Sequence, residues 1–146
     1  RRNAAETRSS GAEIEAERRF SRVTVTGGYL FADSTITEFP SDPTLVGRMV
    51  PQVPRHQFTL QARYSRGRWL ASGQFRASSS QFDDDLNQFR LEPYGQLDVF
   101  VLRSIGERLR VFAAVENVFN SRYSVGKTPI RTVSSPALMR VGIRWN

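Results

Sequence analysis

The stretch ARYSRGRWLASGQF, residues 62–75, contains two segments of alternating apolar and polar residues that meet at a short basic turn. Successive side chains of a β-strand point to opposite faces, so a period of two predicts a strand with one apolar face. Tyr64 stands before the turn and Trp69 after it, each in phase with the apolar residues of its own segment. The stretch therefore predicts a β-hairpin with an aromatic side chain beside the turn on each strand.

The same alternation continues along most of the chain. The segment ALMRVGIRWN, residues 137–146, has an apolar residue at every second position, and GAEIEAE, residues 11–17, alternates alanine or isoleucine with glutamate. No segment has a convincing helical period. We therefore expect an all-β fold, an antiparallel up-and-down meander of about seven strands. The expected strands are residues 11–20, 22–35, 54–65, 68–80, 93–104, 107–121 and 137–146.

Short and long connections alternate between these strands. The short connections are RFSR, SRGR and SIGER, and the long ones are residues 37–54, 80–93 and 124–136. In an antiparallel meander every second connection lies at the same end, so the long loops gather at one end. Outer-membrane barrels have this arrangement, with short periplasmic turns and longer extracellular loops. Tyr64 and Trp69 would then lie in an aromatic girdle at the lipid–water boundary, at one level with Trp145 and beside Phe20.

The composition excludes several classes of protein. The 146 residues include no cysteine, which excludes disulfides, thiol catalysis and thiolate metal sites. The formal net charge is +7, but most arginines stand singly between apolar residues and form no basic patch for nucleic acid. No long apolar run is present, which excludes a transmembrane helix. A transmembrane strand needs only about 9–11 residues with every second one apolar, so a barrel fits the composition.

We weigh two other folds against the alternation of apolar and polar residues. A soluble β-sandwich that binds carbohydrate has the same pattern with its apolar face inward, and it is the alternative to a membrane barrel. A basic barrel for single-stranded nucleic acid needs aromatics and arginines on one face, whereas here they mostly take opposite faces. Seven strands alone would leave two unpaired edges, which lipid does not tolerate. The chain starts in polar sequence without methionine, so we expect it to be a fragment with further strands before residue 1.

Few residues have the chemistry of a reactive site. The run Asp83 to Asp85 contains oxygen ligands suited to Ca²⁺, but an acidic loop tip is more often only solvated. His56 is the only histidine, and neither a G-x-S-x-G motif nor a glycine-rich phosphate loop is present. The three glutamates within residues 11–17 share one strand face, where we expect them to meet arginines of neighbouring strands. We therefore expect no enzymatic activity, no metal and no cofactor.

The segment VFAAVENVFNSRYSVGKTP, residues 111–129, resembles the C-terminal end of TonB-dependent outer-membrane receptors. The residues that account for the likeness are Glu116, Asn117, Val118, Phe119, Asn120, Arg122, Tyr123, Val125 and Gly126. Three further stretches resemble the same family in the same order: SSGAEIEAE, PQVPRHQFTLQARY and SSQFDDDLNQFRLEPYGQLDV. The likeness covers essentially the whole chain.

The resemblance implies both a fold and a function. Such receptors have a barrel of about 22 strands with a plug in the lumen, and residues 1–146 would be its C-terminal portion, without the plug. The implied function is TonB-dependent uptake, across the bacterial outer membrane, of a scarce nutrient such as a ferric siderophore or cobalamin. The implied partners are outer-membrane lipid and lipopolysaccharide, TonB through a segment absent from this chain, and the transported ligand, but no nucleic acid. The candidates for ligand contact on extracellular loops are Asp83, Asp84, Asp85, Lys127 and Arg131.

Overall fold

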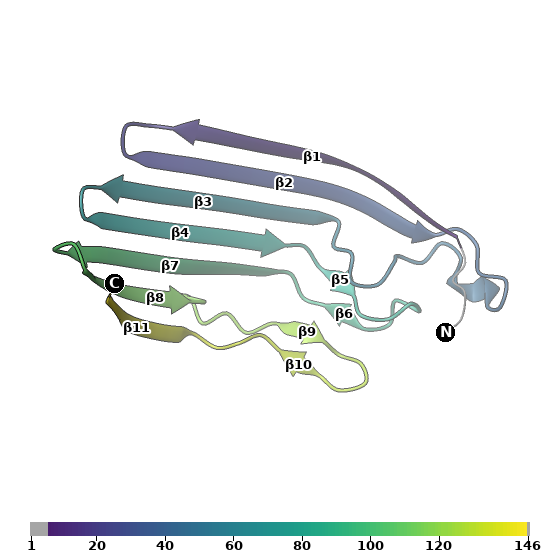
Figure 1. Ribbon diagram of the computed structural model, residues 1–146. Coiled ribbons are helices and arrows are strands. Elements are labelled where there is room, and N and C mark those ends of the chain that lie inside the picture. The colour runs from purple at the N-terminus through teal and green to yellow at the C-terminus, as the bar shows by residue number, and fades with distance from the viewer. Residues whose placement is uncertain (1–5, 146) are drawn as a thin grey trace.

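The computed structural model describes residues 6–145 and contains all seven expected strands. They pair antiparallel in one sheet in the order in which they follow one another along the chain (Figure 1). The strands are β1 (Thr7–Arg19), β2 (Val23–Ile36), β3 (His56–Arg66), β4 (Trp69–Ser78), β7 (Tyr94–Ile105), β8 (Leu109–Glu116) and β11 (Leu138–Trp145). The predicted all-β antiparallel meander is confirmed.

The remaining short elements all belong to the long loops. The 3-10 helix η1 (Pro43–Leu45) lies in the first long loop. The second loop contains the pair β5 (Gln81–Phe82) and β6 (Arg90–Leu91), and the third contains β9 (Ser124–Gly126) and β10 (Thr132–Val133). All three long loops lie at one end of the sheet and the short turns at the other (Figure 1). We call these the loop end and the turn end.

Two strand boundaries differ from the sequence-based expectation by four or more residues. The first strand begins at Thr7 and not at residue 11, because its pairing with β2 continues as far as Ile36. The sixth strand ends at Glu116 and not at residue 121, because Asn117 has a φ of 51°. A strand needs extended backbone, so a residue in the left-handed region ends it. The expected end of the last strand at residue 146 lies outside the described residues.

The strand register separates two faces of the sheet. Leu60 of β3 pairs with Phe75 of β4, and the next residue, Gln61, pairs with Gln74. We call the face with Leu60 and Phe75 the outer face, and the face with the two glutamines the inner face. The outer face also includes Ile14, Tyr29, Tyr64, Trp69, Val99, Val111, Ile143 and Trp145. The hairpin of residues 62–75 therefore has both of its turn-proximal aromatics on the apolar face, as predicted.

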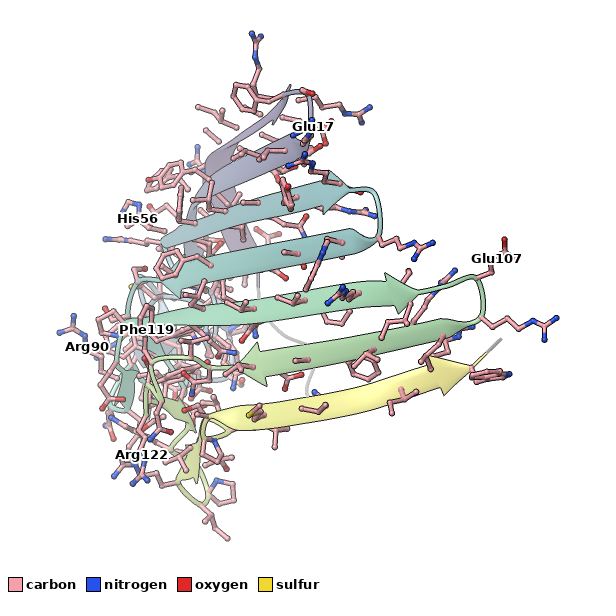
Figure 2. The ribbon with its side chains drawn as sticks, turned by 90° about the vertical axis from the view of Figure 1, so that its left-hand side faces the viewer. Glu17, His56, Arg90, Glu107, Phe119 and Arg122 are labelled. Atoms are coloured by element: carbon pink, nitrogen blue, oxygen red, sulfur yellow. The ribbon has the colours of Figure 1, made fainter. Side chains whose placement is uncertain are left out.

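The sheet is a single layer that carries side chains on both of its faces (Figure 2). The buried hydrophobic side chains among residues 6–145 are Ile36, Leu45 and Leu91, all at the loop end. On the outer face, by contrast, Ile14 and Ile143 are 68% and 71% exposed. A sandwich would bury such a face against a second sheet, so the soluble-sandwich alternative is not supported. Among the described residues, no helix has the length and apolarity needed to span a membrane.

The inner face differs from the expectation on β1. The glutamates of β1 were expected to meet arginines across the strands, but Glu13 pairs with Leu30 and Glu15 with Gly28. The residues opposite them on β2 are thus not basic, because the register is set by apolar packing on the other face. Near the turn end, the inner face of β7 and β8 also carries apolar side chains, since the rings of Phe100 and Phe112 stack with their centroids 6.0 Å apart. The segment LDVFVL of β7 thus has apolar side chains on both faces, and its one polar residue, Asp98, lies on the inner face.

Candidate functional site

The three long loops are joined at the loop end by one carboxylate, Asp83 of the second loop. Its Oδ2 accepts hydrogen bonds from the backbone N–H groups of Lys127 and Thr128 and from the Thr128 hydroxyl, each at 2.7 Å. Its Oδ1 accepts one from the Gln52 amide of the first loop at 3.0 Å. We call these four residues the Asp83 cluster. It ties together segments 31 to 45 residues apart in the sequence.

The charge of the Asp83 cluster is stabilised by its own hydrogen bonds. The Thr128 hydroxyl, the Lys127 N–H and the Gln52 amide hold the pKa of Asp83 far below its ordinary value of 3.8. Beside the cluster, the Lys127 ammonium lies 2.7 Å from a carboxylate oxygen of Glu92. This hydrogen bond is the main cause that lowers the pKa of Glu92 to about 2. Both carboxylates are therefore ionised at neutral pH.

The acidic run continues as a tight turn beyond Asp83. Asp84 accepts hydrogen bonds from the backbone N–H groups of residues 88 and 89, at 3.1 and 2.7 Å. Asn87 has a φ of 57° and bonds to both backbone groups of Met49, at 2.7 and 2.9 Å. This turn fastens the second loop to the first. No group of three or more metal-ligating carboxylate or histidine side chains occurs among residues 6–145.

The five candidate ligand-contact residues thus occupy different environments. The structure brings Asp83 and Lys127 together and uses Asp84 to close the turn. Asp85 is exposed at the turn's tip. Arg131 is also exposed, and only its Nε is engaged among the hydrogen bonds of the described residues, donating to the Ser124 hydroxyl at 3.1 Å. Ligand contact by these residues remains a prediction.

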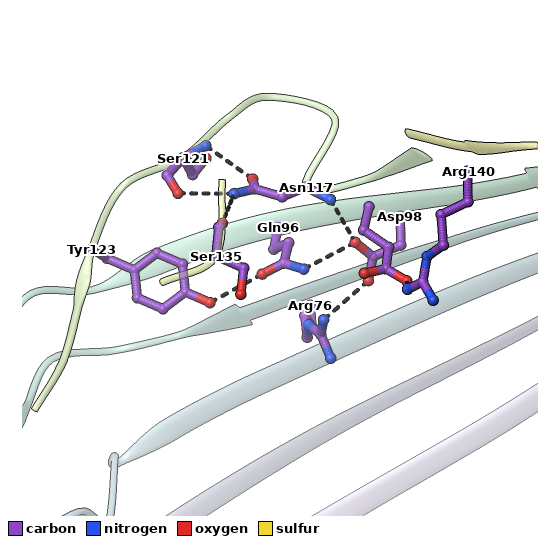
Figure 3. Close-up of polar contacts among 9 residues, drawn as sticks. Arg76, Gln96, Asp98, Asn117, Ser121, Tyr123, Ser135 and Arg140 are labelled. Carbon is purple, nitrogen blue, oxygen red and sulfur yellow. Dashed lines mark hydrogen bonds and ion pairs between the residues drawn. The ribbon is translucent and has the colours of Figure 1, made fainter. Parts of the chain in front are cut away.

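Beneath the loops, a polar network on the inner face holds the third loop to the sheet (Figure 3). Its centre is Asn117, which is 1% exposed. The Nδ2 group of Asn117 donates to the carbonyls of Ser121 and Ser135, at 3.0 and 2.9 Å. Its Oδ1 accepts from the Ser121 N–H at 2.9 Å, and its own N–H donates to Asp98 at 2.8 Å. Every polar atom of this side chain is therefore satisfied.

The network continues across β7 and β4. Asp98 accepts hydrogen bonds from Gln96 at 2.9 Å and from Arg76 at 3.0 Å. The Tyr123 hydroxyl donates to Gln96 at 3.0 Å, and its ring stacks on Tyr94 with the centroids 4.0 Å apart. Burial raises the pKa of Tyr123, so the hydroxyl keeps the proton that it donates. Asn117 and Tyr123, which are among the residues that account for the family resemblance, thus fix the third loop to the sheet.

Sequence reasoning missed several residues of this site. It found Asn117 and Tyr123 only through a resemblance and assigned them no structural role. Gln52, Thr128 and Gln96 gave no local signal, because the loop residues that they bind, Asp83 and Tyr123, lie 27 to 45 residues away in the sequence. Such contacts depend on how the loops pack and not on the strand period.

Comparisons with known proteins agree with this architecture. The family described as "TonB dependent receptor-like, beta-barrel" matches residues 1–118. The ferrichrome outer membrane transporter/phage receptor of Escherichia coli is 33% identical over 129 residues, which are 81% of this chain and 17% of that protein.

Solved structures show the same fold. The ferric yersiniabactin uptake receptor FyuA of Yersinia pestis aligns with 98% of this chain and 24% of its own, at 22% identity and a TM-score of 0.85. The siderophore receptor PiuA of Acinetobacter baumannii aligns with 98% of this chain and 22% of its own, at 16% identity and a TM-score of 0.86. This chain therefore spans about a fifth of the length of the proteins that it matches.

Proposed function

The chain belongs to the TonB-dependent receptors of the bacterial outer membrane, and from this premise we propose that it forms part of the barrel wall of a receptor that imports a ferric siderophore. This family consists of receptors and transporters, not of enzymes. The kinship with a ferrichrome transporter favours a ferric siderophore over cobalamin as the transported nutrient.

The observation that supports a receptor role best is the organisation of the loop end. The Asp83 cluster holds three long loops as one unit above the polar inner face. A ligand entering a barrel from outside meets such loops first, and tied loops lose less conformational entropy when they bind it. The Asn117 network fixes the third of these loops to the wall.

Within these loops, we propose that Asp85 and Arg131 contact the ligand directly. Both side chains are exposed, and Arg131 keeps its terminal N–H groups for an acceptor on the ligand. Asp83, Asp84 and Lys127 then act by positioning, because their polar groups are committed to loop–loop and turn contacts.

The proposal extends to the parts that this chain lacks. The plug and the segment that contacts TonB belong to other parts of the receptor, which also supply the strands that close the barrel. Outer-membrane lipid and lipopolysaccharide surround the outer face, and no nucleic acid takes part.

Uptake of radioactive iron by cells that lack or express the complete receptor tests this function. We expect one ferric siderophore of a structurally diverse panel to be taken up only when both the receptor and TonB are present. Arg131→Ala and Asp85→Ala should reduce binding of that siderophore, whereas Glu107→Ala, in a turn at the opposite end, should not. Receptor-dependent uptake of cobalamin alone would overturn the proposed substrate class.

A further inference from the structure

Two arginines and a tryptophan form a row on the outer face at the turn end. Arg66 of β3 pairs with Trp69 of β4, and Trp69 pairs in turn with Arg103 of β7. The Arg103 guanidinium carbon lies 4.9 Å from the centroid of the Trp69 ring. The five ion pairs among residues 6–145 involve neither Arg66 nor Arg103. Two cations outside these ion pairs thus stand at the turn-end border of the outer face.

A shallow groove of about 330 Å³ begins at this row and continues along the outer face. Trp69 and Arg103 line it together with Val101 and Val111. The small Ala113 lies between the larger Val101 of β7 and Val141 of β11, which also line the groove. The lining is almost wholly apolar and includes Ile105 and Phe112, and its one charged residue is Arg103. The groove therefore combines an apolar surface with a single cation.

The chemistry of this site matches one class of molecule. An apolar groove favours a hydrocarbon chain, because the chain makes many dispersion contacts with the residues that line the groove. A guanidinium presents a planar set of N–H donors that suits a phosphate. The tryptophan places the row at the depth where lipid headgroups begin. A phosphate joined to acyl chains satisfies all three features, whereas free phosphate leaves the groove empty.

We infer that the Arg66–Trp69–Arg103 row and the adjoining groove bind an anionic phospholipid of the leaflet on the turn side of the membrane. The inference rests on the proposed position of this chain in a barrel wall. The phosphate lies between the two guanidinium groups, and one acyl chain follows the groove past Ala113. A net anionic headgroup is preferred to a zwitterionic one, because a choline cation would be repelled by the two arginines.

Native mass spectrometry of the complete receptor, released from nanodiscs of equal phosphatidylglycerol and phosphatidylcholine, tests this inference. We expect wild-type receptor to retain phosphatidylglycerol preferentially. Arg66→Gln and Arg103→Gln should each weaken retention about fivefold, in line with the contribution of one arginine near an anionic surface. Ala113→Phe should also weaken it by filling the groove without any change in charge.

Matched controls separate this site from general attraction by a basic protein. Arg63→Gln removes the same charge from β3 on the inner face, and Arg144→Gln does so on β11. Both should retain phosphatidylglycerol as the wild type does. Equal losses in these controls and in the outer-face variants would overturn the site, as would equal retention of the two lipids by the wild type. Siderophore uptake is measured in parallel, so that failure of the lipid site is distinguished from failure of the transport proposal.

Discussion

At the scale of single residues, Asn117 explains why an asparagine ends β8. Its φ of 51° lies in the left-handed region, which asparagine tolerates better than most residues. The buried side chain also needs two donors for the carbonyls of Ser121 and Ser135 and one acceptor for the Ser121 N–H. Only an amide on a short side chain meets both requirements.

Replacing this amide by a carboxylate should therefore loosen the third loop. Asn117→Asp keeps the size and backbone tolerance but turns an acceptor toward two carbonyls. We expect a loss of about 1–3 kcal/mol in the free energy of unfolding, the cost of leaving buried polar groups unsatisfied. Asn120→Asp is the matched control, because Asn120 also has a positive φ and uses its Oδ1 only to accept a bond from Ala137. Denaturant unfolding of the receptor in detergent compares the two variants. Equal losses of unfolding free energy would contradict the role of the Asn117 amide in fixing the third loop.

Asp83 makes the coupling of the loops depend on pH in a defined direction. Its pKa is lowered in the folded protein, so its stabilising contribution is complete above the ordinary value of 3.8 and is lost as the pH falls below it. Spin labels at Asp85 and Ile130 should therefore show an unchanged distance distribution from about pH 7 to 4, and the distribution should broaden only as the pH falls well below 3.8 toward the lowered pKa of Asp83. Asp83→Asn should broaden it at every pH. Broadening of the wild type near neutral pH would be inconsistent with this assignment.

At the scale of elements, the strands were predictable and the loop contacts were not. Period-two alternation specifies a strand and its faces together, as in residues 62–75, because one apolar face fixes the register. The turns were visible as well, since Gly67 and Gly106 supply the positive φ values of 56° and 67° that tight turns need. The partners of Asp83 were not visible, because they come from two other loops.

The assignment of faces can be tested on one strand. Leu60 is on the outer face near the middle of β3, and Gln61 is its inner-face neighbour. Leu60→Arg should lower the stability of the receptor in bilayers by about 2–4 kcal/mol, the cost of arginine at mid-membrane on a lipid-facing strand. Gln61→Arg should cost far less, because its side chain points to the polar inner face. Similar losses for both variants would refute the assignment.

At the scale of the molecule, the single-layer sheet does not enclose a hydrophobic core by itself. Its edge strands, β1 and β11, each have one partner among the described residues, and their apolar side chains are exposed. Unpaired strand edges with such side chains associate with other chains. Residues 1–146 expressed alone should therefore aggregate in plain buffer or require detergent. A monodisperse monomer with a cooperative thermal transition in size-exclusion and melting experiments would argue against a barrel wall.

The orientation of the whole sheet follows from its sorted connections, and it too can be measured. Long loops face outward and short turns face the periplasm in outer-membrane barrels, so the Asp83 cluster should lie outside the cell. Single cysteines at Asp85 and Ile130 should react with an impermeant thiol reagent on intact cells. Cysteines at Arg68 and Glu107 should react only after the outer membrane is opened.

Arg68 and Glu107 are better sites for cysteine than Gly67 and Gly106. Both glycines have a positive φ, so a residue with a side chain there would strain the backbone. Labelling of the turn positions but not the loop positions on intact cells would reverse the orientation and, with it, the leaflet assigned to the Arg66–Trp69–Arg103 row.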